Sequence, residues 1–306
     1  MKKPSESPLK MKTTSHLTSH IIKRGPTFRS GLLVALSVLG LGLQSSKAAL
    51  LLEYSFNQST GTTAYDTGAA PAANGTLNGG ATWSNSLPSG SGYSLSLDGA
   101  NGSNVDAGVV SKIAGLSQLT VTLWVNLTAA PANLDRLFST MNSTNDGGMD
   151  FYISTPTSGS ISASNFQISF GVDGTSIGAG ANLDANNQWV FLAVTYDGTL
   201  ASNNTLFYSG SVATSSSQLG TTKTINSGAV SGTTGSLQVG DTQASPSDRT
   251  PSGLFSGLRI YDTVLTSTEI NDVRLATVPE PSAVAMLGLG IAGSLFVFRT
   301  RRNRVG

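Results

Sequence analysis

The chain has 306 residues, only 11% of them charged, and no cysteine, so it has neither a disulfide framework nor a thiol nucleophile. Its formal net charge of +1 conceals three segments of different charge. Residues 1–48 carry +7, residues 49–277 carry −9 and residues 278–306 carry +3. The acidic middle segment argues against nucleic acid or an anionic membrane surface as a partner.

Residues 1–48 have the pattern of an export signal. A basic, Ser/Thr-rich leader precedes an apolar run at residues 32–43, which is short for a transmembrane span. Small residues then precede a predicted cut between Ala48 and Ala49. We therefore expect a signal peptide, rather than a membrane anchor or a core helix, followed by a secreted domain at residues 49–277.

The strongest strand signal lies at residues 189–198, which are rich in β-branched and aromatic side chains and end at an Asp-Gly turn. Both alternating faces are apolar, one formed by Trp189, Phe191 and Ala193 and the other beginning at Val190. This pattern predicts a central strand that is covered on both sides, with Trp189 as a packing residue.

Shorter strands are expected on either side of this one. The candidates are residues 50–56, 92–99, 104–109, 120–127, 136–140, 149–154, 165–172, 205–208, 236–239 and 257–261. A Gly/Ala/Asn/Thr-rich stretch at 57–80 is expected to be a loop. Thr266 and Glu269 fit a capping box, which predicts a short helix to about residue 275. Many short strands with almost no helix predict an all-β sandwich.

Several strings in this segment resemble the LamG-like jelly-roll module. They are Leu-Glu-Tyr-Ser-Phe at 52–56, Asp-Thr-Gly at 66–68, Asn-Gly-Thr-Leu at 74–77, Leu-Asp-Gly at 97–99, and the runs at 119–125, 189–198 and 257–270. The resemblance implies a concanavalin A-like lectin/glucanase fold, a jelly-roll β-sandwich of two antiparallel sheets. It does not imply one activity, because this fold hosts lectins, hydrolases and adhesion modules.

The C-terminal segment, residues 278–306, resembles the PEP-CTERM sorting signal of Gram-negative bacteria. An apolar run at residues 283–298 separates a Pro-Glu-Pro box from an arginine cluster. The residues of the signal are Val278, Pro279, Glu280, Pro281, Arg299, Arg301, Arg302 and Arg304. The resemblance implies an exosortase-type protease as a partner and a transmembrane sorting helix that anchors the chain transiently, with its basic end in the cytoplasm. It also implies a final location in the envelope, at the surface or in the extracellular matrix. An ordinary C-terminal anchor is the alternative.

Catalysis can be examined by elimination. Both histidines, His16 and His20, lie in the leader, so residues 49–277 cannot form a Ser-His-Asp triad or a zinc-protease motif. Hydrolases of the resembled fold use a Glu-x-Asp-x-x-Glu strand, which is absent here. Asp146 and Asp150 could form a carboxylate pair, but we expect solvated turn residues there. We therefore expect no enzyme and assign no catalytic residue.

Two candidate binding features remain. Asp66 and Asn74 lie in the early loop where modules of the resembled family can hold calcium, although Ser256 stands where relatives often have an aspartate. An Asx-turn is the alternative role for Asp66. Trp83, in a polar setting, is the candidate for stacking on a sugar, and a core or edge-covering role is equally compatible with its position.

The sequence therefore predicts an exported, non-catalytic surface module that binds a glycan or a surface protein, or that forms part of the exopolysaccharide layer. The alternative is a polysaccharide-degrading glycoside hydrolase that uses aspartates. Calcium is a candidate cofactor, and nucleic acid is not an expected partner.

Overall fold

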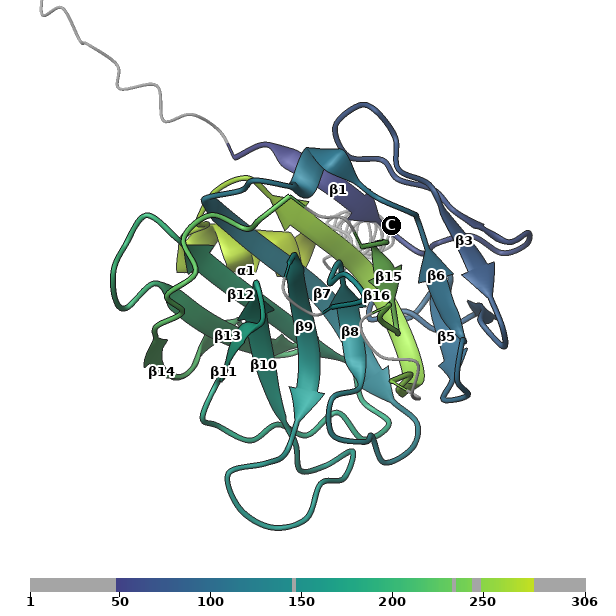
Figure 1. The fold of residues 1–306 in the computed structure, drawn as a ribbon. Coiled ribbons are helices and arrows are strands. Elements are labelled where there is room, and N and C mark those ends of the chain that lie inside the picture. The colour runs from purple at the N-terminus through teal and green to yellow at the C-terminus, as the bar shows by residue number, and fades with distance from the viewer. Residues whose placement is uncertain (1–47, 145–146, 233–234, 244–248, 278–306) are drawn as a thin grey trace, which may run out of the picture. The chain divides into compact units, whose positions relative to one another are not determined.

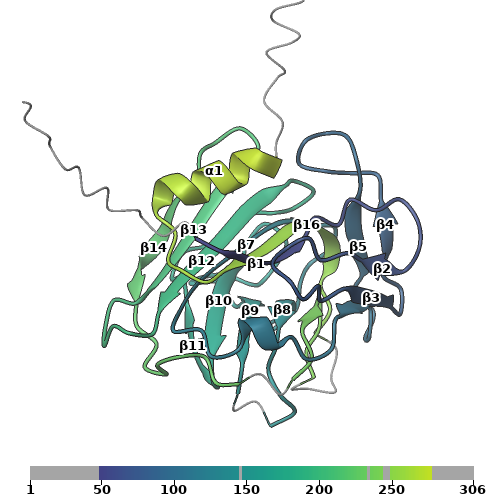
Figure 2. The ribbon, with the colours of Figure 1, turned by 90° about the horizontal axis from the view of Figure 1, so that it is seen from above.

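The computed structural model describes residues 48–277, apart from residues 145–146, 233–234 and 244–248 (Figure 1). In this part of the chain, two antiparallel sheets lie face to face, and the helix α1 covers the outside of one of them (Figure 2). The predicted all-β sandwich is thus confirmed. The predicted signal peptide before Ala48 and the predicted sorting helix lie outside the described residues.

The chain passes several times between the two sheets. In order the elements are β1 (Leu50–Tyr54), β2 (Thr63–Ala64), β3 (Gly75–Asn78), β4 (Thr82–Ser84), β5 (Ser94–Asp98), β6 (Asn104–Asp106), the 3-10 helix η1 (Ser111–Ile113), β7 (Gln118–Leu127), β8 (Arg136–Ser139), β9 (Met149–Ser154), β10 (Gln167–Val172), β11 (Thr175–Gly178), β12 (Val190–Asp197), β13 (Thr205–Ser211), β14 (Ser217–Lys223), β15 (Gln238–Val239), β16 (Ser252–Tyr261) and α1 (Ser267–Thr277). The strands β8 to β11 are consecutive in one sheet, and β12 to β14 are consecutive in the other. Every strand predicted from periodicity overlaps one of these, whereas β2 and β3 lie in the stretch predicted as a loop.

Sheet A has the strand order β14-β13-β12-β7-β16-β5-β4, and β1 also pairs with β16. The middle position belongs to β7, which pairs with β12 on one side and β16 on the other. The expectation that residues 189–198 form the central strand is therefore wrong by one position. The ten-residue strand β7 is longer than the eight-residue β12, and both of its faces are buried.

The last strand, β16, closes the sandwich by pairing with two partners on one edge. Its first half pairs with β5 and its second half with β1. A break in its register with β7 lies between Ser256 and Arg259, where Gly257 has a φ of 60°. A β-bulge bends a strand, and glycine adopts this backbone conformation without strain. The first and last strands of the domain are thereby joined.

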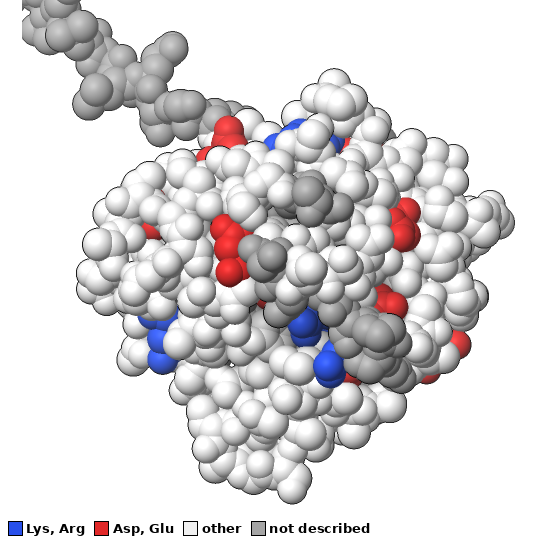
Figure 3. All heavy atoms as spheres, viewed as in Figure 1, with Lys and Arg blue, Asp and Glu red and all other residues white. Residues whose placement is uncertain are grey.

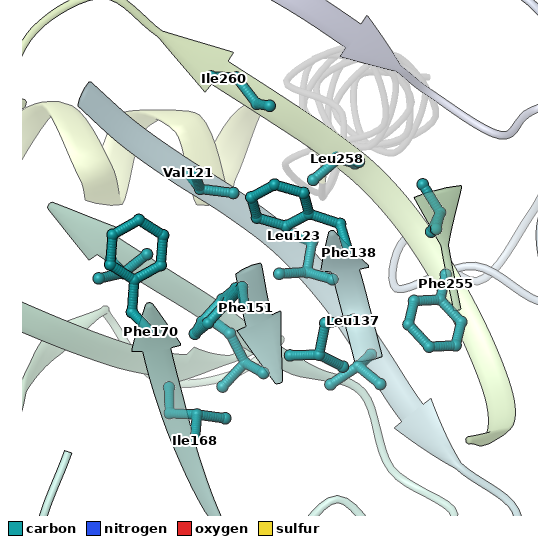
Figure 4. Close-up of a cluster of buried hydrophobic side chains, with 14 of the residues drawn as sticks. Val121, Leu123, Leu137, Phe138, Phe151, Ile168, Phe170, Phe255, Leu258 and Ile260 are labelled. Atoms are coloured by element: carbon teal, nitrogen blue, oxygen red, sulfur yellow. The ribbon is translucent and has the colours of Figure 1, made fainter. Parts of the chain in front are cut away.

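Sheet B has the order β11-β10-β9-β8-β15-β6-β3-β2 in the described residues. The core lies between it and sheet A, and Figure 4 shows the facing side chains. β7 and β16 contribute aliphatic and aromatic residues from one side, including Leu123 and Phe255, and β8 to β10 contribute Phe138, Phe151 and Phe170 from the other. Period-2 alternation places each strand's remaining side chains outside.

A second apolar cluster lies on the outside of sheet A, beneath α1. Trp124 and Phe191 pack edge to face, with ring centroids 5.3 Å apart, against Ile270 of the helix. The two predicted faces of residues 189–198 are confirmed, because Phe191 belongs to this cluster and Val190 to the main core. Trp189 directly precedes β12, is partly buried and packs against this cluster, so its predicted role as a packing residue is confirmed.

The predicted capping box at the start of α1 is confirmed. The backbone N–H and the hydroxyl of Thr266 both donate to the Glu269 carboxylate, each at 2.8 Å, and Glu269 N donates back to the Thr266 hydroxyl at 3.3 Å. Helix ends leave four N–H groups without intrahelical partners, and this exchange satisfies one of them. Ile270 packs α1 against the outside of sheet A, and in the described part of the chain no α-helix lies on the outside of sheet B.

Candidate functional site

The outer face of sheet B carries one continuous row of small polar residues. The strand pairings place seven residues, one from each of seven strands, side by side. They are Thr76, Asp106, Gln238, Ser139, Asp150, Gly171 and Ser176, and we call them the polar row. Their apolar sequence neighbours, such as Leu77 and Phe151, belong to the core on the opposite face.

Exposure along the polar row falls from its ends to its centre. Thr76 and Ser176 are exposed, whereas Ser139 is 0% and Asp150 is 4% exposed. Few charged residues are visible on this side of the molecule, and they are scattered (Figure 3). The face is therefore polar, its visible charges are scattered, and its central residues are the least exposed.

The centre of the row contains a buried ion pair. Arg136 of β8 lies 3.0 Å from the Asp150 carboxylate through its Nη2 atom and donates from Nη1 to the carbonyl oxygen of Leu134 at 2.6 Å. Its guanidinium lies 4.6 Å from the centroid of the Tyr152 ring, and the Tyr152 hydroxyl lies 2.9 Å from Ser176 Oγ. Among the described residues, the buried Nε atom of Arg136 has no hydrogen-bond partner.

A cavity of about 150 Å³ opens beside this pair, and we call it the Arg136 pocket. Arg136, Asp150, Tyr152 and Ser176 contribute polar atoms to its lining, and Gly171 adds no side chain. A Cβ atom on Gly171 would meet Asp150 Oδ1 and would lie 3.2 Å from the Cβ of Ser176. Glycine at this position therefore leaves room both for the ion pair and for the pocket.

Burial is the largest influence on the pKa values of Arg136 and Asp150. It raises the pKa of Asp150, and the positive charge of Arg136 opposes that rise. It also lowers the pKa of Arg136, and the charge of Asp150 opposes that change. Arg249 lowers the pKa of Arg136 further, whereas Asp135 raises it. Described groups of both signs therefore influence Arg136.

Two larger hollows lie elsewhere among the described residues. One, of about 380 Å³, is lined by Asp98 and Asp135, and the other, of about 270 Å³, by Ser256 and Arg259. Arg259 is bonded to Glu53 Oε1 at 2.7 Å and also reaches the last turn of α1. That arginine already binds partners within the fold.

The predicted calcium residues hold a loop together in the structure. Asp66 accepts hydrogen bonds from the backbone N–H groups of Glu53, Gly68 and Ala73. Lys112 Nζ lies 2.5 Å from Asp66 Oδ2 and 2.6 Å from the carbonyl oxygen of Ala69. Burial would raise the pKa of Asp66, but these hydrogen bonds, led by that of Lys112, lower it overall.

This donor set does not fit a calcium ion, because the Lys112 ammonium already binds the carboxylate and carbonyl oxygens that calcium would use. Asn74 does not join them, because its Oδ1 accepts a hydrogen bond from Asp66 N at 2.9 Å. The bond from Gly68 N to Asp66 Oδ1 is the Asx-type contact that the sequence analysis gave as the alternative. Among the described residues, no group of three or more His, Cys, Asp or Glu could hold a metal ion.

Trp83 lies on the edge strand β4, partly buried against the main core. Its indole N–H donates to the carbonyl oxygen of Gly61 at 2.8 Å. The side chain therefore pins a neighbouring loop, which matches the edge-covering role rather than a free stacking surface.

The remaining predicted residues divide between described and undescribed parts of the chain. Ala49 N donates to the Asp262 carboxylate at 2.9 Å, and the predicted signal-peptide cut lies directly before this residue. Asp146 and the sorting signal from Val278 onward lie outside the described residues. No helix within residues 48–277, as far as the structure describes them, is long and apolar enough to cross a membrane.

Sequence reasoning missed Arg136 and Tyr152. Both lie in segments predicted as strands, but no role was assigned to their side chains. The available signal was a pair of polar residues, Arg136 and Asp150, on the alternate positions of two otherwise apolar strands. The pairing of β8 with β9, which brings them together, was not readable from either segment alone.

Comparison with solved structures supports the fold. Domain 4 of AbnA, a GH43 extracellular arabinanase from Geobacillus stearothermophilus solved with arabinotriose, aligns with a TM-score of 0.51 and 19% identity over 74% of this chain and 98% of that one. A Trypanosoma rangeli sialidase aligns with a TM-score of 0.50 and 11% identity over 76% of this chain and 34% of the sialidase. At such identities the likeness shows the fold alone. No curated protein sequence matches the chain.

Sequence families provide the assignment. Residues 277–302 match the PEP-CTERM protein-sorting motif, which confirms the resemblance of the tail. Residues 98–271 match the concanavalin A-like lectin/glucanases superfamily, and this match covers more than half of the chain. The chain therefore belongs to the concanavalin A-like lectin/glucanases superfamily and carries a PEP-CTERM protein-sorting motif at its C-terminal end.

Proposed function

We propose that the chain is an exported, non-catalytic carbohydrate-binding module. In this proposal residues 49–277 form the module, residues 1–48 are a signal peptide and residues 278–306 a sorting signal. The PEP-CTERM motif supports export and sorting to the surface of a Gram-negative bacterium, and the superfamily supports glycan recognition. An exosortase-type protease would be the processing partner.

The polar row is the observation that carries the binding function. Neighbouring strands are separated by about 4.8 Å, so seven strands present polar groups over roughly 29 Å. The hydroxyl, amide and carboxyl groups of the row suit the hydroxyl groups of a sugar chain, which both donate and accept hydrogen bonds. The charges visible on this face are scattered and of both signs, and they form no extended patch that would suit a highly charged ligand (Figure 3).

The structural interactions of the acidic residues support a non-catalytic role. The two glutamates of residues 49–277 both have structural partners, Glu53 at Arg259 and Glu269 in the cap of α1. Asp150 is buried beside Arg136. A glycosidase needs one carboxylic acid and one free carboxylate on either side of the bond that it cleaves. Hydrolysis by aspartates remains the competing function.

The test is a glycan array with the exported protein, followed by hydrogen exchange with the best-bound polysaccharide. We expect slower exchange in peptides from β8, β9 and β10 and unchanged exchange in α1, which serves as the internal control. Protection outside sheet B would contradict the site. Release of new reducing ends from the polysaccharide would favour the hydrolase.

The sorting proposal has its own test, mass spectrometry of the surface-extracted protein. We expect a first residue of Ala49 and no residues beyond about Ser282. A mature form that still carried Arg299 to Arg304 would indicate a permanent membrane anchor instead.

A further inference from the structure

We propose that the Arg136 pocket binds a single neutral sugar residue through two adjacent hydroxyl groups. The inference rests on the proposed carbohydrate-binding function and narrows it to one subsite and one ligand class. One hydroxyl oxygen would accept a hydrogen bond from Arg136 Nε, and its neighbour would donate to the Asp150 carboxylate.

The unpartnered Nε atom of Arg136 is the first argument. Buried polar atoms in native proteins are nearly always hydrogen-bonded, so a buried donor without a partner beside a cavity indicates a missing acceptor. The other two nitrogens are directed to Leu134 and Asp150, and they hold the guanidinium in place. A ligand oxygen would complete the set if the lining of the pocket shifts enough to expose Nε, which is buried from solvent in this structure.

Asp150 supplies the acceptor. A carboxylate has about four lone-pair positions, and the described partner of this one, Arg136 Nη2, contacts Oδ2. A donor and an acceptor from one ion pair thus lie next to each other. Adjacent sugar hydroxyls present the complementary acceptor and donor, whereas a carboxylate ligand would present acceptors only.

The local charge selects a neutral ligand. Among the described residues, Arg136 feels the negative charges of Asp150 and Asp135 and the positive charge of Arg249. An anionic sugar would be repelled by the buried Asp150, and a cationic one by Arg136. A ligand without charge leaves these interactions undisturbed.

The size of the cavity limits the ligand to one residue. Pockets for drug-sized molecules measure about 300–1,000 Å³, and the Arg136 pocket has about 150 Å³. Tyr152 acts as a positioning residue, because its ring supports the guanidinium and its hydroxyl is tied to Ser176 on the rim. The rest of a polysaccharide would extend along the polar row.

The experiment is calorimetric titration of the exported protein with methyl glycosides at about pH 7. The probes are neutral hexosides and pentosides, their deoxy analogues that lack one of two adjacent hydroxyls, and methyl glucuronoside. We expect binding of neutral glycosides, with at least tenfold weaker binding of the deoxy analogues and the glucuronoside. If the deoxy analogues or methyl glucuronoside bound as tightly as the neutral glycosides, or more tightly, the assignment of the ligand would be overturned.

Variants locate the site. Arg136→Lys keeps the charge but removes Nε, and Asp150→Asn removes the charged acceptor; we expect each to weaken binding at least tenfold. Arg274→Lys is the matched control, since Arg274 is a buried arginine 4% exposed on α1, far along the chain from sheet B. Unchanged affinity in a folded Arg136→Lys protein would overturn the proposal.

A second pair of variants tests the pocket if Arg136→Lys and Asp150→Asn prevent folding. Ser176→Trp places a bulky ring at the exposed rim of the pocket, and Thr76→Trp does the same at the other exposed end of the polar row. We expect only Ser176→Trp to abolish binding of methyl glycosides. If polysaccharide still binds and Ser176→Trp has no effect on the glycosides, the pocket is wrong while the proposed function stands. If no glycan binds the unmodified protein, both fail.

Discussion

Two buried ion pairs in this domain, Lys112–Asp66 and Arg136–Asp150, differ in how many of their polar atoms have hydrogen-bond partners among the described residues. In the Lys112–Asp66 pair, the carboxylate accepts three backbone N–H groups and the ammonium reaches a second oxygen, that of Ala69. In the Arg136–Asp150 pair, the guanidinium retains an unpartnered Nε and a cavity lies beside it. The Lys112–Asp66 pair, whose polar atoms have partners within the fold, organises a loop. We infer that the Arg136–Asp150 pair, which lacks a described partner at Nε, can bind a ligand in the adjacent cavity.

The pKa values of the two carboxyl groups move in opposite directions because the two groups differ in the hydrogen bonds and charges that oppose burial. Burial acts on both, but at Asp66 the hydrogen bonds to the charged form outweigh it and the pKa falls. At Asp150 burial prevails over the attraction of Arg136, and the pKa rises. The following predictions test whether this difference in satisfaction separates structure from binding.

The largest effect is expected from Asp66→Ala. This change leaves Lys112 buried without its carboxylate and removes the acceptor of three backbone N–H groups, which should cost about 3–5 kcal/mol of unfolding free energy. Urea denaturation of the exported protein measures it. A loss below about 1 kcal/mol, the usual value of an exposed pair, would show that the loop does not depend on Asp66.

Replacement of both partners should separate the two pairs. Arg136→Met with Asp150→Leu removes both charges and leaves few unsatisfied groups, so stability should change by less than about 2 kcal/mol in either direction. Lys112→Met with Asp66→Leu should still be destabilising by at least about 3 kcal/mol, because three N–H groups lose their acceptor. If the two double variants lost the same stability relative to the unmodified protein, the proposed difference between the two ion pairs would be contradicted.

Opposite pH dependences are expected from the two carboxyl groups. The lowered pKa of Asp66 means that its contribution is present above about pH 4 and is lost as the pH falls through the folded-state value. The raised pKa of Asp150 favours the fold below about pH 4, and this contribution is lost as the pH rises. Asp66→Asn should therefore be most damaging at neutral pH, whereas Asp150→Asn should cost less stability at neutral pH than at acidic pH. Parallel stability profiles would refute this.

The smallest effect is expected from calcium. Because Lys112 fills the cation position beside Asp66, excess calcium over a chelator should leave the melting temperature of the exported protein unchanged. A calcium-induced increase that disappears in Asp66→Asn would restore the calcium site predicted from sequence.

Local signals in the sequence were sufficient for the sandwich. Alternation identified β7, and the Thr266–Glu269 spacing identified α1, because both depend on residues close in the chain. The order of the strands was less predictable, because residues 189–198 were expected in the middle of sheet A, a position that β7 occupies.

The candidate site was less predictable, because its contacts join distant segments. Lys112 and Asp66 are 46 positions apart, and neither position indicates the other in the sequence. The polar row depends on the order of seven strands, from Thr76 to Ser176. Asp150 looked like a turn residue because Gly-Gly precedes Met149, whereas it lies one residue inside β9.

The most direct measurement of the central claim is heteronuclear NMR of the arginine Nε–H groups while the exported protein is titrated with the glycan that it binds. Arg136→Lys assigns the resonance of Arg136, and that of Arg274 serves as the reference. We predict that the Arg136 Nε–H signal shifts and its exchange with water slows in proportion to binding, while the Arg274 signal stays unchanged. A saturated binding curve with an unmoved Arg136 signal would contradict the account.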